Sequence, residues 1–211
     1  MKRLKLTLAV VALISGSVPA LAGGPRLVYA EKFADRNCAW CHGPSLQGFF
    51  KAPRLAGQTS QYLKNQLLNF RDHARNDPLA KQYMWGAAAN HLSLQTVRSL
   101  SVYLSRLYPK SADDGHEALA ARGRAIYQGG IPEANIPACV ACHGPDAQGA
   151  AAQGAGQIPR LGGLSYYYLK RRLEQWGEGY NATASRPMPE IASKLSVNEI
   201  DALASYLSFV R

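Results

Sequence analysis

The stretch Cys38-Ala39-Trp40-Cys41-His42 decides the fold expected of this sequence, and the same pattern returns at Cys139-Val140-Ala141-Cys142-His143. Two cysteines three positions apart, followed at once by a histidine, form the C-x-x-C-H pattern of covalent c-type haem attachment. The thiols bind the edge of the porphyrin, and the histidine lies beneath the iron as its proximal ligand. The two copies use all four cysteines of the chain. The sequence therefore predicts two covalently bound haem c groups.

The surroundings of the two motifs also match, which indicates an internal duplication. The matching pairs are Gln47-Gly48 with Gln148-Gly149, Pro53-Arg54-Leu55 with Pro159-Arg160-Leu161, Tyr62-Leu63 with Tyr168-Leu169, Met84 with Met188, and Tyr103-Leu104 with Tyr206-Leu207. The offset between partners drifts only from 101 to 106 and back to 103, so insertions are confined to loops. We expect an N-terminal domain over 23–109, a linker over 110–115 and a C-terminal domain over 116–211.

The spacing of apolar residues predicts helices in both halves and no convincing strand. The clearest helices are expected over 27–36, over a segment that starts with Ser60 as its N-cap, over 93–107 and over 116–127. The predicted fold class is all-α, with two tandem domains of roughly 90 residues each. Domains of this size bury little apolar surface by themselves, so a buried porphyrin is expected to complete each core.

Residues 1–22 have the features of a cleavable signal peptide. A basic start is followed by an apolar run from Leu6 to Ile14 and by an Ala-x-Ala cleavage site at 20–22. The apolar run is shorter than the ~20 residues that span a bilayer, and no later stretch is long enough. Since c-type haem is attached outside the cytoplasm, we expect a periplasmic protein with no transmembrane span in its mature chain.

The charge of the chain indicates the kind of partner it meets. The formal net charge is +10, and removal of the three cations of the signal peptide leaves +7. A modestly basic protein suits acidic protein partners or peripheral association with an anionic membrane face, whereas scattered basic residues disfavour nucleic acid. Eight basic side chains are candidates to rim a docking surface, although for each one alone we expect an ordinary solvated face. They are Lys64, Arg71, Arg75 and Lys81 in the first half, and Lys170, Arg171, Arg172 and Arg186 in the second.

Each iron also needs a second axial ligand. Met84 and Met188 lie 42 and 45 residues after His42 and His143, and the mature sequence holds no other methionine. Histidine with methionine is a ligand pair of c-type cytochromes, so we predict both methionines as ligands. The two prolines beside Met188 are expected to hold it in a stiff loop. Met84 is also expected in a loop, but without such prolines, and His91 remains an alternative ligand for the first iron.

The loops after the motifs supply candidates for supporting contacts. A ligating imidazole usually donates its other N–H to an oxygen acceptor, which fixes the ring. Pro53 and Pro159 follow their motifs at a suitable distance to offer a carbonyl, although ordinary loop prolines would look the same. Arg54 and Arg160 come directly after them and are candidates to neutralise buried haem propionates, because arginine suits bidentate pairing with carboxylates.

These motifs, the later Pro-x-Leu-x-Gly segments and the methionines before a final helix resemble the class I cytochrome c fold written twice. The tandem form with a signal peptide resembles the dihaem cytochrome c4 family over residues 26–211. The resemblance implies two haem domains related by a pseudo-twofold axis, with their haems close enough for rapid electron exchange. It also implies a role between a quinol-oxidising complex and a terminal oxidase.

Function follows from the predicted ligand sets. Two irons closed by histidine and methionine offer no vacant position to oxygen or peroxide, so we expect a carrier of one electron per haem and not an enzyme. Two alternatives stay open. One is the dihaem subunit of a periplasmic dehydrogenase, such as flavocytochrome c sulfide dehydrogenase, and the other is a dihaem peroxidase, which needs an iron that can open.

Overall fold

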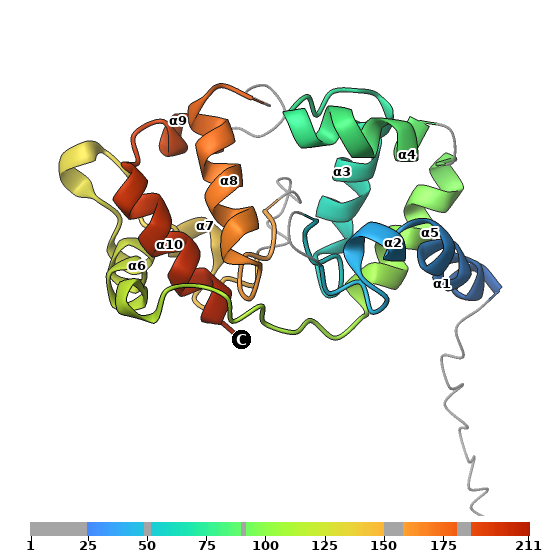
Figure 1. The fold of residues 1–211 in the computed structure, drawn as a ribbon, viewed down its shortest axis with the longest axis horizontal. Coiled ribbons are helices and arrows are strands. Elements are labelled where there is room, and N and C mark those ends of the chain that lie inside the picture. The colour runs from blue at the N-terminus through green and yellow to red at the C-terminus, as the bar shows by residue number, and fades with distance from the viewer. Residues whose placement is uncertain (1–24, 49–51, 90–91, 150–157, 181–186) are drawn as a thin grey trace, which may run out of the picture.

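The computed structural model describes residues 25–48, 52–89, 92–149, 158–180 and 187–211, which form two groups of helices side by side (Figure 1). No β-strand and no helix long and apolar enough to cross a membrane occur in these ranges. The signal peptide expected over 1–22 lies outside them. The prediction of an all-α duplicated fold is confirmed.

The N-terminal domain is built around its last helix. Its elements are α1 (Pro25–Asn37), α2 (Ala39–His42), α3 (Ser60–Arg71), a π-helical turn η1 (Ala80–Met84), α4 (Trp85–Ala89) and α5 (Leu94–Ser105). Helices α1 and α3 both pack against α5, whose face of Val97, Leu100 and Leu104 is almost completely buried. Ser93 begins α5 as its N-cap, because its hydroxyl accepts a hydrogen bond from the backbone N–H of Thr96.

The C-terminal domain repeats this plan. Its elements are α6 (Glu117–Gly129), the 3₁₀ turn η2 (Pro132–Ala134), α7 (Val140–His143), α8 (Tyr166–Gly177), α9 (Met188–Ala192) and α10 (Val197–Phe209). The core is formed where α6 and α8 pack on α10. Gly123 allows the closest approach, since a Cβ added to it would lie only 2.0 Å from the carbonyl oxygen of Ala202 on α10. Ser196 and Glu199 form a capping box that begins α10.

Three local expectations were wrong. Thr59 and not Ser60 precedes the first turn of α3, and its side chain makes no capping hydrogen bond. Met188 was expected in a stiff loop but is the first residue of α9, with Pro187 as N-cap. Proline is well tolerated at the start of a helix because the missing N–H would have no partner there. Met84, also expected in a loop, is the last residue of η1.

The segment between α5 and α6 runs along one edge of both domains (Figure 1). The stretch predicted as a linker over 110–115 contains no helix or strand, but it is hydrogen-bonded on both sides. The backbone N–H of Lys110 donates to the side chain of Gln47 at 2.9 Å, and that of Ala112 donates to the carbonyl of Gly163 at 3.1 Å. This segment therefore fastens the two domains to each other in addition to connecting them.

Candidate haem sites

Both motifs fold into a single helical turn. In the first, the backbone N–H of His42 donates to the carbonyl of Cys38 at 2.9 Å, and in the second that of His143 donates to Cys139 at 2.9 Å. A helical turn places residues i, i+3 and i+4 on one face, so both thiols and the imidazole of each motif point the same way. All four cysteines are free thiols. The backbone thus presents, twice, the arrangement that covalent attachment and axial ligation require together.

The two histidines are held by the carbonyls that the sequence suggested. Nδ1 of His42 lies 2.7 Å from the carbonyl oxygen of Pro53, and Nδ1 of His143 lies 3.1 Å from that of Pro159. A carbonyl can only accept, so Nδ1 carries the proton and donates, which leaves the lone pair of Nε2 free for a metal. Burial lowers the pKa of both histidines, which favours the neutral form that binds iron.

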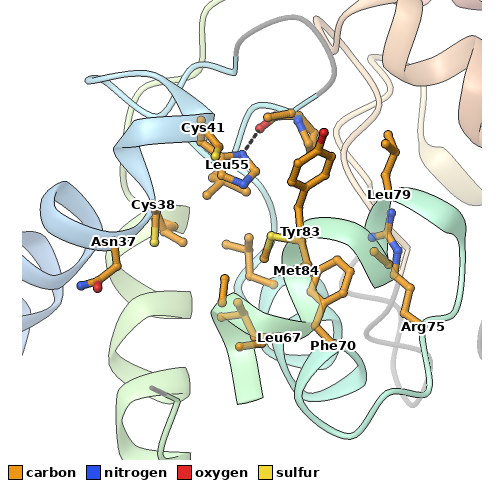
Figure 2. Close-up of a pocket in the computed structure, with 18 of the residues that line it drawn as sticks. Asn37, Cys38, Cys41, Leu55, Leu67, Phe70, Arg75, Leu79, Tyr83 and Met84 are labelled. Carbon is orange, nitrogen blue, oxygen red and sulfur yellow. Dashed lines mark hydrogen bonds between the residues drawn. The ribbon is translucent and has the colours of Figure 1, made fainter. Parts of the chain in front are cut away.

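A cavity of about 420 Å³ lies against the first motif. Figure 2 shows Cys38 and Cys41 on one side of it and the thioether of Met84 facing inward from η1. The remaining wall is mostly apolar, with Leu63, Phe70, Leu100 and Leu104 among its residues. Two thiols, an imidazole and a thioether around an apolar cavity form a donor set that fits a covalently bound haem.

The second motif also lies against an apolar core. Met188 is partly buried and packs, together with Cys139, against the core of the C-terminal domain. The hydroxyl of Tyr127 donates to the carbonyl of Gly144 at 2.6 Å and so fixes the backbone next to His143. His91, the alternative ligand of the first iron, lies outside the described residues.

Arg54 lies at the contact between the two domains. The Nη1 of Arg54 donates to the carbonyls of Lys110 at 2.6 Å and Gly163 at 2.9 Å, and its Nη2 donates to Gly162 at 2.7 Å. Arg54 therefore joins the N-terminal domain to the linker and the C-terminal domain, a role that its sequence position did not reveal.

Arg54 and Arg160 are the arginines predicted to pair with the haem propionates. Nε of each is buried and has no hydrogen-bond partner in the described part of the chain. Burial, and after it the nearby charge of Arg160, lower the pKa of Arg54 to about 10, so the charged guanidinium is disfavoured here. An anionic group such as a haem carboxylate would relieve both features, but neither arginine lines the cavity beside the first motif. The pairing itself stays a prediction.

Gln58 was missed by the sequence reasoning. Its Nε2 donates to the carbonyl of Arg160 at 2.9 Å, and its Oε1 accepts from the N–H of the same residue at 2.7 Å. The equivalent residue in the second half is Leu164. A polar residue matched by an apolar one in the duplication is the one signal that could have pointed to a contact between domains.

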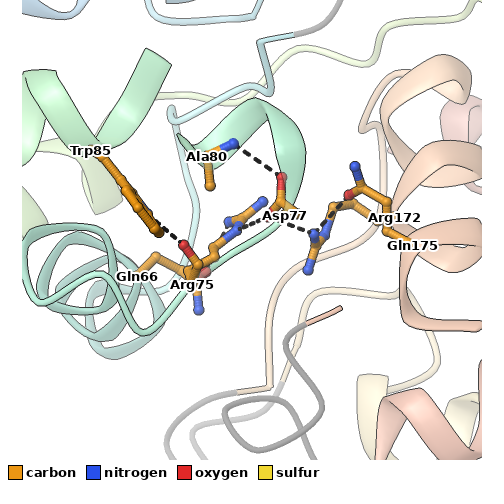
Figure 3. Close-up of polar contacts among 7 residues, drawn as sticks. All are labelled: Gln66, Arg75, Asp77, Ala80, Trp85, Arg172 and Gln175. Carbon is orange, nitrogen blue, oxygen red and sulfur yellow. Dashed lines mark hydrogen bonds and ion pairs between the residues drawn. The ribbon is translucent and has the colours of Figure 1, made fainter. Parts of the chain in front are cut away.

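Two of the arginines expected on solvated faces are instead buried between the domains. Arg75 is 9% and Arg172 6% exposed, because both pair with the buried carboxylate of Asp77. Nε of Arg75 lies 2.8 Å and Nη1 of Arg172 lies 3.1 Å from Oδ2 of Asp77 (Figure 3). We call Arg75, Asp77 and Arg172 the interdomain charge cluster. Gln66 and Gln175 complete it by accepting from Arg75 and Arg172, respectively.

Comparisons with known proteins agree with this geometry. The family model described as Cytochrome c matches residues 28–107 and again 120–210. A cytochrome c4 from Thiocapsa roseopersicina is 33% identical over 84% of this chain and 88% of its own length. A thiosulfate dehydrogenase electron acceptor from Stutzerimonas stutzeri (strain A1501) is 34% identical over 100% of this chain and 97% of its own.

A solved structure of cytochrome c4 from Acidithiobacillus ferrooxidans superimposes with a TM-score of 0.74 at 34% identity, over 82% of this chain and 99% of that one. Because 99% of that chain is covered, both domains share its architecture. The chain therefore belongs to the cytochrome c family, as a dihaem cytochrome of the c4 type with two covalently bound haem c groups.

Proposed function

We propose that this dihaem electron carrier takes electrons, one per haem, from a quinol-oxidising complex and delivers them to a terminal oxidase. The observation that carries the proposal is the position of His42 and Met84 around one apolar cavity. His143 and Met188 hold the equivalent positions in the duplicated half of the sequence. When bound, haem supplies a one-electron iron couple whose potential is raised by a thioether ligand. An iron closed on both sides has no open position for a substrate, which favours a carrier over a peroxidase.

The protein's own residues favour rapid electron transfer. Each imidazole is held by a backbone carbonyl, so the ligand needs no reorientation when the charge of the iron changes. The apolar wall of the first cavity, with Leu63 and Phe70, excludes water from the site. A fixed ligand and the exclusion of water both reduce the rearrangement that must accompany electron transfer.

We further propose that the protein acts in the periplasm. The basic n-region, apolar run and Ala-x-Ala site at its N-terminus support export, and attachment of haem c takes place outside the cytoplasm. The net charge of +7 expected for the mature chain supports docking on acidic surfaces of redox partners.

Stopped-flow mixing of the reduced protein with a purified terminal oxidase tests this function. We expect fast oxidation of both haems at low salt, with a rate that falls as ionic strength rises, since charge steering is screened over about 10 Å at 0.1 M salt. The Met84→Ala variant is the matched control, because it should open one iron and alter its transfer rate. Absence of oxidation at low salt by any oxidase tested, with both haems intact, would exclude the role.

A second candidate donor is a thiosulfate dehydrogenase. It is favoured by the relative from Stutzerimonas stutzeri, which carries that partner in its name and matches this chain along its whole length. Thiosulfate plus purified thiosulfate dehydrogenase should then reduce both haems as fast as a quinol-oxidising complex does. Co-purification of a larger dehydrogenase subunit would instead favour a fixed complex over a mobile carrier. Rapid binding of cyanide by the oxidised wild-type protein would indicate an openable iron and support a peroxidase.

A further inference from the structure

The cavity beside the first haem motif is not closed by the N-terminal domain alone. Four residues of α8 in the C-terminal domain also line it, namely Tyr168, Arg171, Arg172 and Gln175. Arg75 and Asp77 line the same cavity from the N-terminal domain, and Arg172 pairs with Asp77 across the two domains. Figure 3 shows Arg172 and Gln175 reaching from α8 toward the segment before η1. The environment of the first haem is therefore formed by both domains.

Positive charge is in excess at this place. All fourteen carboxylate side chains of the chain belong to described residues. Among them Asp77 is the one within ion-pair distance of Arg75 or Arg172, and none in the described ranges pairs with Arg171. Nε of Arg171 and Nε of Arg172 are buried without a hydrogen-bond partner in the same ranges. Buried N–H donors of cationic groups that find no protein acceptor point to an anionic group supplied by the ligand.

Arg171 and Arg172 have no charged counterparts in the first half of the chain. With the offset of 106 that applies to this helix, Arg171 and Arg172 correspond to Asn65 and Gln66 of α3. Helix α8 therefore presents two cations where its counterpart presents two neutral amides.

We propose that Arg171 and Arg172 of the C-terminal domain are positioning residues of the first haem site, where they face the haem carboxylates and raise the reduction potential of the first haem. The inference rests on the proposed electron-carrying function of that haem. Oxidised haem has one more positive charge than reduced haem, so nearby cations stabilise the reduced state. Asp77 acts in the opposite direction because its negative charge stabilises the oxidised state. The docking of the two domains thus sets the potential of the first haem.

Two substitutions of opposite sign test this. Arg172→Gln removes a positive charge and should lower the potential of the first haem, whereas Asp77→Asn removes a negative charge and should raise it. A unit charge about 10 Å from the iron, at an effective dielectric constant of about 20, changes the ratio of reduced to oxidised haem roughly tenfold. For a one-electron couple that ratio corresponds to about 59 mV. A purely structural disturbance would shift the potential in the same direction in both variants.

Controls come from the same helix. Arg172→Lys keeps the charge and should leave the reduction potential of the first haem close to its wild-type value. Lys170→Gln removes the same charge from α8, but Lys170 pairs with Asp201 and does not line the cavity, so its effect should be much smaller. Potentials are measured in the full chain by redox titration, and the haems are told apart by the NMR signals of the Met84 and Met188 methyl groups.

The outcomes separate this inference from the function on which it rests. Opposite shifts of the first haem in the two variants support the proposal. Unshifted potentials, or shifts of one sign, with both methionine signals present would overturn it and leave the carrier function intact. Absence of the Met84 signal in the wild-type protein would refute the ligand set of the first haem itself. If Arg172→Gln fails to fold, the upward shift in Asp77→Asn and the unchanged potential of Arg172→Lys still decide the question.

Discussion

Replacement of Gly123 by alanine tests the packing that orients the second haem motif. Gly123 is buried in α6 where this helix crosses α10. A Cβ at this position would lie 2.0 Å from the carbonyl oxygen and 2.6 Å from the carbonyl carbon of Ala202, and 2.7 Å from Cβ of Tyr206. Ordinary contacts of a Cβ begin near 3.4 Å. Two of the three atoms belong to helical backbone and cannot rotate away, so the two helices must separate by more than 1 Å.

The magnitude follows from two opposing terms. Alanine is favoured over glycine within a helix by about 0.5–1 kcal/mol. Overpacking of a core costs typically 1–3 kcal/mol, and we take about 3 kcal/mol here because backbone is the obstacle. The net loss in the free energy of unfolding is then about 2 kcal/mol. For a domain of this size such a loss lowers the melting temperature by roughly 8–16 °C.

Gly129 offers a matched control in the same helix. A Cβ added to Gly129 meets no atom within 4 Å, and the residue does not have the positive φ that would disfavour alanine. Gly129→Ala should therefore leave stability unchanged or raise it by up to about 1 kcal/mol. Denaturation of the haem-loaded variants, followed by helical circular dichroism and haem absorption, measures both. A Gly123→Ala protein as stable as Gly129→Ala would refute the reasoning.

Three further predictions concern the haems and the domain interface. Met84→Ala and Met188→Ala should each remove about half of the methionine-to-iron charge-transfer band and lower one potential, and an intact band in either variant would contradict that ligand. Arg54→Ala should speed proteolytic cleavage of the linker about tenfold or more, because it removes three hydrogen bonds worth about 1.5–3 kcal/mol each. Arg54→Lys should not restore the protection, since one ammonium group cannot reach all three carbonyl oxygens. Burial opposes ionisation of Asp77, but Arg75, Arg172 and the backbone N–H of Ala80 together hold its pKa below the usual range. The stability that Asp77 adds is therefore present above about pH 4 and is lost as pH falls through the folded pKa. Melting temperatures of wild type and Asp77→Asn should therefore converge in acid, and a constant difference down to about pH 2 would contradict this.

The long helices could be predicted because their signals are local. The expected helix over 27–36 is α1 (Pro25–Asn37), and the expected final helix of the first half is α5 (Leu94–Ser105). Apolar residues at helical spacing bury one face whatever the rest of the chain does. The elements around Met84 and Met188 could not be predicted in this way, because a turn of five residues holds too few apolar positions to show a period.

The domain interface was the part that sequence reasoning misplaced. Arg75 and Arg172 were expected in solvent, since arginine side chains are mostly exposed. Their burial depends on Asp77, which is distant from Arg172 in sequence and belongs to the other domain. The spacing of apolar residues predicts which face of a helix packs within its own domain, but it does not predict contacts with a second domain. Pairing of charges between domains therefore needs the three-dimensional structure.

The interface also explains why a duplicated chain has unequal halves. In the pseudo-twofold arrangement that the family resemblance implies, residues near the axis meet their own equivalents. Tyr62 and Tyr168 are such a pair, and their hydroxyls form a hydrogen bond because each can both donate and accept. Two equivalent arginines would repel each other at the same place. An interface of this kind favours divergence at charged positions, as at Arg172, whose counterpart is Gln66, and such divergence gives the two haems different surroundings.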